Sequence, residues 1–427
     1  MNNPLNQTLS LPCGEILDNR IAKSAMSEGL ATVRGVPTDE LANLYRLWSE
    51  GGAGLLLTGN IMIDAGHRER MRNIVIDGSP SSQMRNALAN WAKAGKKSGN
   101  HFWAQLNHPG RQIAKVMNEN PKAPSAIPVD MPGDVFGQPV EMTRDEIFEV
   151  IGKFASSASV VKEAGFTGVQ IHSAHGFLLS QFLSPKSNHR KDRYGGSLEN
   201  RARLLLEVVA KVRDTVGKEF PVSVKLNSTD FQRSGFTFED SLQVAQWLEE
   251  AGIDLLEISG GNYEQPKLLG AEGVISEEVD VTEESTLRKE GYFSGFADSI
   301  RAAINIPVMV TGGVRKQLTM QQLIADGSVD MIGIARPMCV MPDAPKKLLA
   351  GLVELPCYEN TLSYFPWWLS FIKFFKLARI LDTFSKMHWF NCRIQELGSD
   401  GYANTQMSAK TSSKRYRESE QKLREQC

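Results

Sequence analysis

Two histidines near the middle of the chain stand where α/β folds place their chemistry. His172 and His175 come at the end of the apolar stretch 168–171 (GVQI), which is typical of a buried parallel strand. Catalytic groups in barrels and doubly wound sheets lie at the carboxyl ends of such strands. One histidine at this place would more often be a structural loop residue. A pair of them, followed by the polar stretch 187–196, favours a catalytic role.

Two later apolar stretches end in residues that suit an anion. The first is followed by Gly312 and Gly313, and the second by Ala335 and Arg336. Glycines after the last two strands of a barrel commonly bind phosphate, because their backbone N–H groups can approach it closely. A Gly-Gly pair alone is more often a tight turn, but Arg336 would add a guanidinium that matches phosphate oxygens. A phosphate site is therefore favoured.

Three further polar residues fit a planar cofactor anchored by that phosphate. Lys225 lies in an otherwise apolar stretch, where a buried lysine is rare unless it has a partner. Gln105 lies in another such stretch, and Ser27 follows the first one. A cation, an amide and a hydroxyl around a phosphate-anchored ring describe a site for flavin mononucleotide (FMN). Lys225 would stabilise negative charge on the reduced ring, and Ser27 would tune its potential.

Alternating strand-like and helix-like stretches position these residues. Strands are expected at 21–25, 54–58, 101–106, 168–171, 222–226, 255–258, 308–310 and 331–334, with helices between them and threonine caps at 38, 143 and 237. Eight such units over roughly 320 residues predict a (β/α)8 TIM barrel. A doubly wound sheet fits less well, because no G-x-G-x-x-G motif follows the first strand.

Composition restricts the class of protein. Of 427 residues, 41% are apolar and 23% charged, and the net charge is −1, so a large core is expected and no basic field that would recruit nucleic acid. The five cysteines form no C-x-x-C pair, which argues against a disulfide scaffold, a zinc site or an iron–sulfur cluster. No signal-peptide pattern and no membrane-spanning apolar run are present, so a cytoplasmic location is expected.

The motifs resemble, in type and order, those of the old yellow enzyme family of NAD(P)H:flavin oxidoreductases. The similar segments are 19–26, 104–111 (AQLNHPGR), 172–176 (HSAHG), 181–185 (QFLSP), 193–197 (RYGGS), 200–201 and 311–313, within residues 8–345. The resemblance implies an FMN-bearing barrel that takes hydride from NAD(P)H and passes it to an electron-poor alkene by a ping-pong route. It also implies that His172 and His175 donate to the substrate oxygen. The implied FMN contacts are Ala25, Met26, Ser27, Gly59, Gln105, Lys225, Gly312, Gly313, Ala335 and Arg336.

The chain departs from the family pattern at position 177. Many members have there a tyrosine that protonates the substrate, whereas Phe177 has no proton to give. Tyr263, which follows the sixth strand, is the alternative donor that the sequence offers. The departure keeps open a flavin enzyme that reduces nitro compounds, quinones or oxygen. A degenerate barrel that serves as a scaffold is a third hypothesis, against which the intact set of site residues argues.

The patterns divide the chain into a barrel domain (1–345), a C-terminal helical extension (346–400) and a polar tail (401–427) expected to be disordered. Residues 362–390 are rich in aromatics, with basic residues in one sector, which predicts a helix packed on the barrel or on a second copy. An interfacial membrane helix is the less favoured alternative. The expected partner of the barrel is a small-molecule substrate, and a homo-oligomer remains open.

Overall fold

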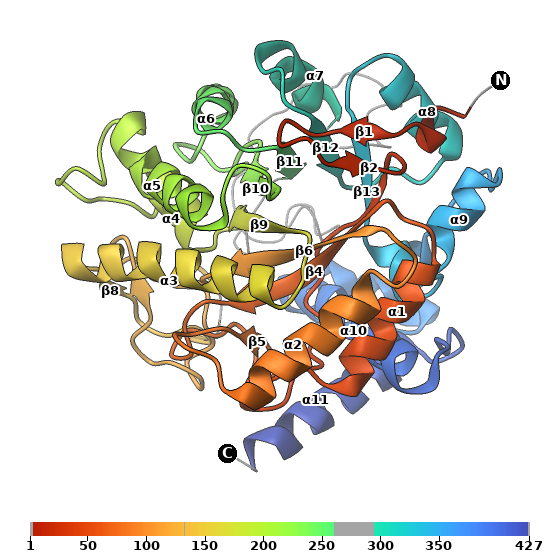
Figure 1. Cartoon of the computed structure of the whole chain (residues 1–427). Coiled ribbons are helices and arrows are strands. Elements are labelled where there is room, and N and C mark those ends of the chain that lie inside the picture. The colour runs from red at the N-terminus through yellow and green to blue at the C-terminus, as the bar shows by residue number, and fades with distance from the viewer. Residues whose placement is uncertain (1–2, 132, 260–293, 426–427) are drawn as a thin grey trace.

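A closed barrel forms the centre of the computed structural model, which describes residues 3–131, 133–259 and 294–425 (Figure 1). Within these residues eight parallel strands pair in the order β3, β13, β12, β11, β10, β9, β6, β4, and β4 pairs back with β3. Their bounds are β3 Ile21–Lys23, β4 Leu55–Met62, β6 His101–Asn107, β9 Gly168–Ser173, β10 Val222–Asn227, β11 Leu255–Ser259, β12 Val308–Thr311 and β13 Met331–Ile334. The predicted (β/α)8 barrel is confirmed.

Helices cover the outside of the barrel (Figure 1). They are α1 Asp39–Glu50, α2 Ser82–Gly95, α3 Arg144–Glu163, α5 Leu198–Val216, α6 Phe238–Glu250, α7 Ser294–Ala303 and α8 Gln317–Ala325. The hydroxyls of Thr38, Thr143 and Thr237 cap α1, α3 and α6 as expected, each accepting a backbone N–H from the first helical turn. Glu146 completes a capping box with Thr143.

Apolar side chains close the amino end of the barrel. A hairpin of β1 (Leu9–Ser10) and β2 (Ile16–Leu17) places Leu9 and Leu17 in a buried cluster with the first residues of several strands, among them Leu55 and Met331. This cluster is separate from the larger core between the strands and the helices. The carboxyl end, by contrast, carries buried polar side chains, as expected for the functional end of a barrel.

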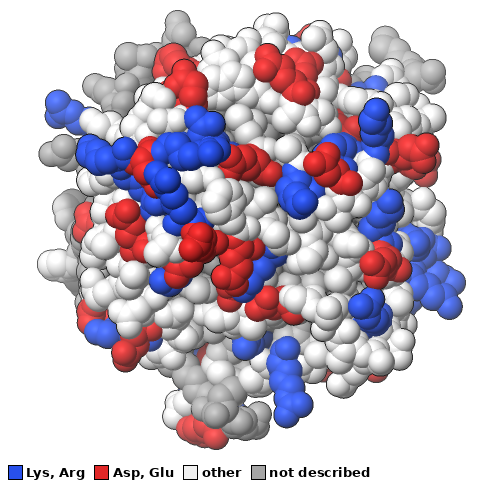
Figure 2. Space-filling view, turned by 60° about the vertical axis from the view of Figure 1, so that its left-hand side comes forward, with Lys and Arg blue, Asp and Glu red and all other residues white. Residues whose placement is uncertain are grey.

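At the carboxyl end, most strands end at a different residue than expected, β3 and β4 among them. β3 stops at Lys23, and β4 continues to Met62, so Gly59 lies inside a strand. Additional short elements are β5 Ile74–Val75, β7 Lys122–Ala123, β8 Val140–Glu141 and the helix α4 Leu178–Leu183, which follows the two histidines. On the surface, Figure 2 shows acidic and basic side chains interspersed over the face that it draws.

The segment 401–427, for which composition predicts disorder, contains a helix, so that prediction is wrong. α10 (Lys376–Asp400) is followed by α11 (Ala409–Arg424), which packs against it (Figure 1). Arg393 and Arg415 lie 2.9 Å from different oxygens of Glu396, which is 4% exposed. Tertiary partners of this kind stabilise a helix that its polar composition alone would not.

The rest of the extension connects the barrel to α10. It contains α9 (Ala344–Leu349), the short 3-10 helix η5 (Tyr358–Asn360) and the 3-10 helix η6 (Trp367–Phe374). The helical stretch expected over 362–390, with an interruption at Pro366, is divided between η6 and α10. α10 lies against α1, where Trp389 and Leu397 join the main core. Among the described residues no helix is both long and apolar enough to cross a membrane.

Candidate active site

His172 and His175 lie together at the carboxyl end of β9, with ring centroids 5.1 Å apart. Nδ1 of His172 accepts the backbone N–H of Ala174 at 3.2 Å, which assigns the proton of the neutral ring to Nε2. The ring of Phe177 packs edge-on against His172 at a centroid distance of 4.9 Å. Phe177 therefore forms part of the packing around the first histidine.

An unusual backbone conformation holds His175. Its φ is +60°, a region that residues with a Cβ seldom adopt. Its backbone N–H donates to Oδ1 of Asn227 at 3.0 Å, and its Nε2 lies 2.8 Å from the hydroxyl of Ser259. Partners on β10 and β11 thus hold a strained turn after β9. Strain maintained in this way is typical of functional sites.

Both imidazoles are neutral near pH 7. Burial lowers the pKa of His172 well below its ordinary value, and His175 and Lys225 lower it further. Burial and Lys225 lower the pKa of His175 in the same way. Donation by the hydroxyl of Ser259 to Nε2 would place the proton of His175 on Nδ1. Each ring then offers one N–H donor.

Beside the histidines, buried polar side chains on neighbouring strands of the barrel form a chain of hydrogen bonds. Nε2 of Gln105 donates to Gln170 at 2.7 Å, and Nε2 of Gln170 donates to Glu257 at 2.8 Å. The other carboxylate oxygen of Glu257 lies 2.8 Å from Nζ of Lys225. Lys225, expected from the sequence to face an electron-rich ring, therefore forms a direct ion pair within the protein, in register with His172 on β9.

Sequence reasoning missed two members of this chain, Gln170 and Glu257. Glu257 is fully buried in an otherwise apolar strand. That is the same signal that singled out Lys225, and two opposite charges on apolar strands would have suggested a pair. Gln170 carries a weaker signal, since one amide in a buried strand is common.

The ends of β12 and β13 form a cationic turn. Gly312 and Gly313 have φ of +143° and +76°, conformations that glycine alone adopts readily. Arg336, which follows Ala335, has Nη1 3.0 Å from Oε1 of Glu359. Arg315 has Nη2 2.8 Å from the same oxygen. Two guanidinium groups share one carboxylate, which leaves positive charge beside the glycine turn. Neither Arg315 nor Glu359 was predicted as a site residue.

The connection after β3 carries Ala25, Met26 and Ser27. The hydroxyl of Ser27 donates to the carboxylate of Glu69 at 2.5 Å. A Cβ atom added to Gly59 on β4 would lie 2.2 Å from the carbonyl oxygen of Met26, so these two segments approach too closely for any larger residue.

The backbone N–H of Gly59 donates to the buried carboxylate of Glu28 at 2.8 Å. Close packing against the connection after β3 thus accounts for the glycine, and its N–H is satisfied within the protein.

These features fit FMN. The glycine turn with Arg336 provides backbone N–H groups and a cation for a phosphate. Gln105 and Lys225 provide polar groups on the barrel wall. Tyr263, the expected proton donor, lies outside the described residues.

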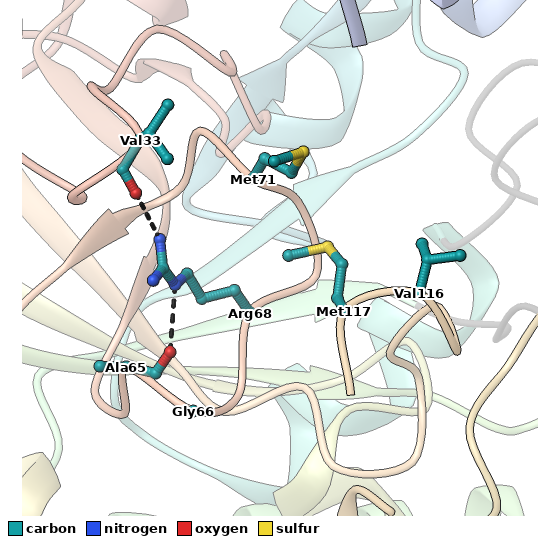
Figure 3. A pocket seen from close by; sticks show the side chains of 7 residues that line it. All are labelled: Val33, Ala65, Gly66, Arg68, Met71, Val116 and Met117. Carbon is teal, nitrogen blue, oxygen red and sulfur yellow. Dashed lines mark hydrogen bonds between the residues drawn. The ribbon is translucent and has the colours of Figure 1, made fainter. Parts of the chain in front are cut away.

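A pocket of about 370 Å³ lies between the connections that follow β3, β4 and β6 (Figure 3). It is lined by Val33, Ala65, Gly66, Arg68, Met71, Val116 and Met117. Arg68 joins two of its walls, because Nη1 donates to the carbonyl of Val33 at 2.7 Å and Nε to that of Ala65 at 3.1 Å. The pocket is thus an apolar recess with one cation at the functional end of the barrel.

Asp64, His67 and His108 place possible ligand atoms within 4.8 Å of one another. However, Nε2 of His67 accepts the backbone N–H of Lys122 at 3.1 Å, so the neutral ring carries its proton on Nδ1, the atom facing Asp64. The ammonium of Lys153 also lies 2.7 Å from Asp64. A proton and an ammonium at this carboxylate favour a hydrogen-bonded cluster that ties the connection after β6 to the one after β4.

Fold and site together define a barrel oxidoreductase of the flavin class. The sequence profile of the NADH:flavin oxidoreductase / NADH oxidase family matches residues 14–354. The chain belongs to this family, whose cofactor is FMN and whose reductant is a nicotinamide nucleotide.

Relatives with similar sequences agree with this assignment. The chain is 38% identical to the NADH-dependent flavin oxidoreductase iliE of Neonectria sp. (strain DH2) over 354 residues, which cover 79% of this chain and 46% of that protein. It is 33% identical to the NADH-dependent flavin oxidoreductase iccE of Talaromyces variabilis over 421 residues, 93% of this chain and 99% of that protein. The chain thus spans less than half of the first relative and nearly all of the second.

Solved structures share the fold. A 2-naphthoyl-CoA reductase complex superposes with a TM-score of 0.74 at 25% identity, over 83% of this chain and 54% of that one. The old yellow enzyme homologue from Zymomonas mobilis superposes with a TM-score of 0.67 at 26% identity, over 83% and 95%.

Proposed function

We propose that the protein reduces electron-poor alkenes such as enones, taking hydride from NAD(P)H in one half-reaction and delivering it in the next by a ping-pong route. The observation that supports this best is the pair of neutral histidines at the carboxyl end of β9. Two N–H donors aimed at a carbonyl oxygen stabilise the negative charge that develops there as hydride arrives at the β-carbon.

The surrounding residues have separate roles in this proposal. Arg336 and the Gly312–Gly313 turn hold the phosphate of FMN, and Gln105 and Lys225 contact its ring. When bound, FMN supplies the centre that accepts hydride from the nicotinamide and donates it to the alkene. Burial, helped by the charge of Lys225, keeps His172 and His175 neutral, so they act as hydrogen-bond donors and not as acids.

The proton for the α-carbon needs a source other than position 177. Phe177 is 3% exposed and packs on His172, which leaves water or Tyr263 as the donor. General acid help typically contributes about 10²–10⁴-fold. Phe177→Tyr should therefore raise turnover of cyclic enones and leave nitroaromatic reduction nearly unchanged. Tyr263→Phe should slow enone reduction at least about tenfold if Tyr263 is the donor.

A second candidate function is reduction of nitro compounds, quinones or oxygen by the same flavin. The apolar Phe177 supports it, because these acceptors do not need a proton at a carbon atom. A scaffold without activity is disfavoured by the complete donor set of Gln105, His172, His175, Lys225 and Arg336 at one end of the barrel.

Anaerobic stopped-flow kinetics distinguishes these functions. The purified protein is reduced with NADH or NADPH, and its reoxidation by an enone, a nitroaromatic and oxygen is followed through flavin absorbance. Fast reoxidation by the enone, lost in His172→Ala and His175→Ala, supports the first proposal. Reoxidation only by the other acceptors, unaffected by these variants, supports the second.

A further inference from the structure

Four aromatic side chains project from the surface at the start of the C-terminal extension. Trp367, Trp368, Phe374 and Phe375 are 86%, 60%, 92% and 67% exposed. All lie in η6 or directly after it. Single exposed apolar residues are ordinary on a protein surface, but large apolar residues gathered in one place mark interaction sites. These four residues are called the aromatic patch below.

The segment that carries the patch is attached to the rest of the protein. The carboxylate of Asp382 on α10 accepts the backbone N–H of Tyr364 at 2.7 Å and the hydroxyl of Ser363 at 3.1 Å, just before η6. α10 in turn lies against α1 on the barrel. A supported segment with outward aromatic side chains is prepared for a partner before binding, which lowers the ordering cost of association.

Charge around the patch distinguishes between partners. The sequence from 363 to 386 contains four basic residues, Lys373, Lys376, Arg379 and Lys386, and one acidic residue, Asp382. A symmetric dimer formed through the patch would bring the basic residues of two chains together, and like charges oppose such contacts. The surface of an anionic membrane would attract the same residues.

The residue types agree with the lipid partner. Tryptophan is enriched at the boundary between membrane and water. Interfacial segments combine basic residues with Trp, Phe and Leu on their apolar side. We propose that the aromatic patch binds the surface of an anionic lipid membrane, so that the protein lies on the membrane without crossing it. This proposal is independent of the acceptor that the flavin reduces.

Co-sedimentation of the full FMN-loaded protein with phosphatidylcholine vesicles, with and without phosphatidylserine, tests the proposal. The wild-type protein should sediment with the vesicles that contain phosphatidylserine, and high salt should weaken binding because it screens the charges. Trp367→Ser/Trp368→Ser should lower the vesicle partition coefficient at least about tenfold, since the inserted aromatic area is lost.

Phe148→Ser is the matched control, because Phe148 is 55% exposed on α3, away from the patch in sequence. It should bind vesicles like the wild-type protein. Unchanged flavin absorbance and stability in the double variant exclude unfolding as the cause of lost binding.

Three results would overturn the proposal. One is no sedimentation with phosphatidylserine vesicles even at low salt, and another is equal binding by the double variant. The third is a stable dimer in sedimentation velocity that the double variant abolishes, which would assign the patch to an interface between copies of the chain.

Discussion

Among the described residues, two buried lysines lie near the carboxyl end of the barrel, and their surroundings differ. Lys225 lies inside the barrel, with its ammonium 2.8 Å from the carboxylate of Glu257. Lys23 lies at the end of β3, with its ammonium 3.9 Å from Glu28 and hydrogen-bonded instead to the hydroxyl of Tyr45 at 3.0 Å. Lys225 thus forms a direct ion pair, whereas the hydrogen bonds of the Lys23 ammonium go mainly to neutral groups.

This difference appears in the pKa of Lys23. Burial lowers that pKa to about 8, although Glu28 acts in the opposite direction. The ring of Trp48 lies 4.3 Å from the ammonium and offsets part of the burial cost through a cation–π contact. Lys23 joins β3 to α1 and has a structural role. Lys225 adjoins the histidines and, after burial, contributes to lowering their pKa, so the two pairs should respond differently to mutation.

Removing Lys225 should have the largest effect on stability. Lys225→Met removes the ammonium from the buried carboxylate of Glu257 and leaves it the hydrogen bond from Gln170, and breaking a buried pair costs about 3–5 kcal/mol. Chemical denaturation of the flavin-free protein measures the loss. Lys225→Met/Glu257→Gln should recover most of it, because no unpaired charge remains.

The comparison fails if Lys23→Met costs as much as Lys225→Met. In Lys23→Met, Glu28 keeps the hydroxyl of Tyr45 and the N–H of Gly59 as donors, so a smaller loss is expected.

The histidine pair should affect catalysis without a similar loss of stability. His172→Ala removes the Nε2–H donor, and loss of one such donor costs about 10²–10³-fold in rate, or about 2.7–4 kcal/mol. Stopped-flow reoxidation by an enone measures this, with reoxidation by oxygen as the control that should barely change. Wild-type enone rates in His172→Ala and His175→Ala would make both residues structural.

Lys23 should make stability depend on pH in the alkaline range. The unfolded chain keeps the lysine proton up to its ordinary pKa of 10.5, whereas the folded protein releases it from about 8. The unfolded state therefore binds more protons between these values, and the stability difference between wild type and Lys23→Met should rise with pH there. The total rise of this stability difference across the interval between the two pKa values is roughly 3 kcal/mol. Denaturation at pH 7, 8, 9 and 10 measures the difference, and a flat curve would contradict the shifted pKa.

The sequence predicted most of the barrel because its signals are local. Apolar strand runs and the caps at Thr38, Thr143 and Thr237 depend on neighbouring residues, and all three caps are present. The site was only partly predictable, since Glu257 and Glu359 meet their partners across the fold. The helix α11 was missed for the same reason: it packs on α10, and its Arg415 pairs with Glu396 of that helix.

Arg336 is a third cation paired with a carboxylate, that of Glu359, but it lies nearer to the surface than the two lysines. Its removal should have the smallest of the effects predicted here. Arg336→Ala should weaken FMN binding by about 1.5–3 kcal/mol, since one charge-assisted phosphate contact is lost.

Glu359→Gln tests the carboxylate that is paired with Arg336. Glu359 lies 3.0 Å from Arg336 and competes with a phosphate for its guanidinium, so this variant should bind FMN at least as tightly as the wild type. Quenching of FMN fluorescence on titration with flavin-free protein measures both affinities, and the flavin released from the native protein should be FMN and not FAD. Weaker binding in Glu359→Gln would show that the carboxylate positions Arg336, and unchanged binding in Arg336→Ala would remove the phosphate from this end of the barrel.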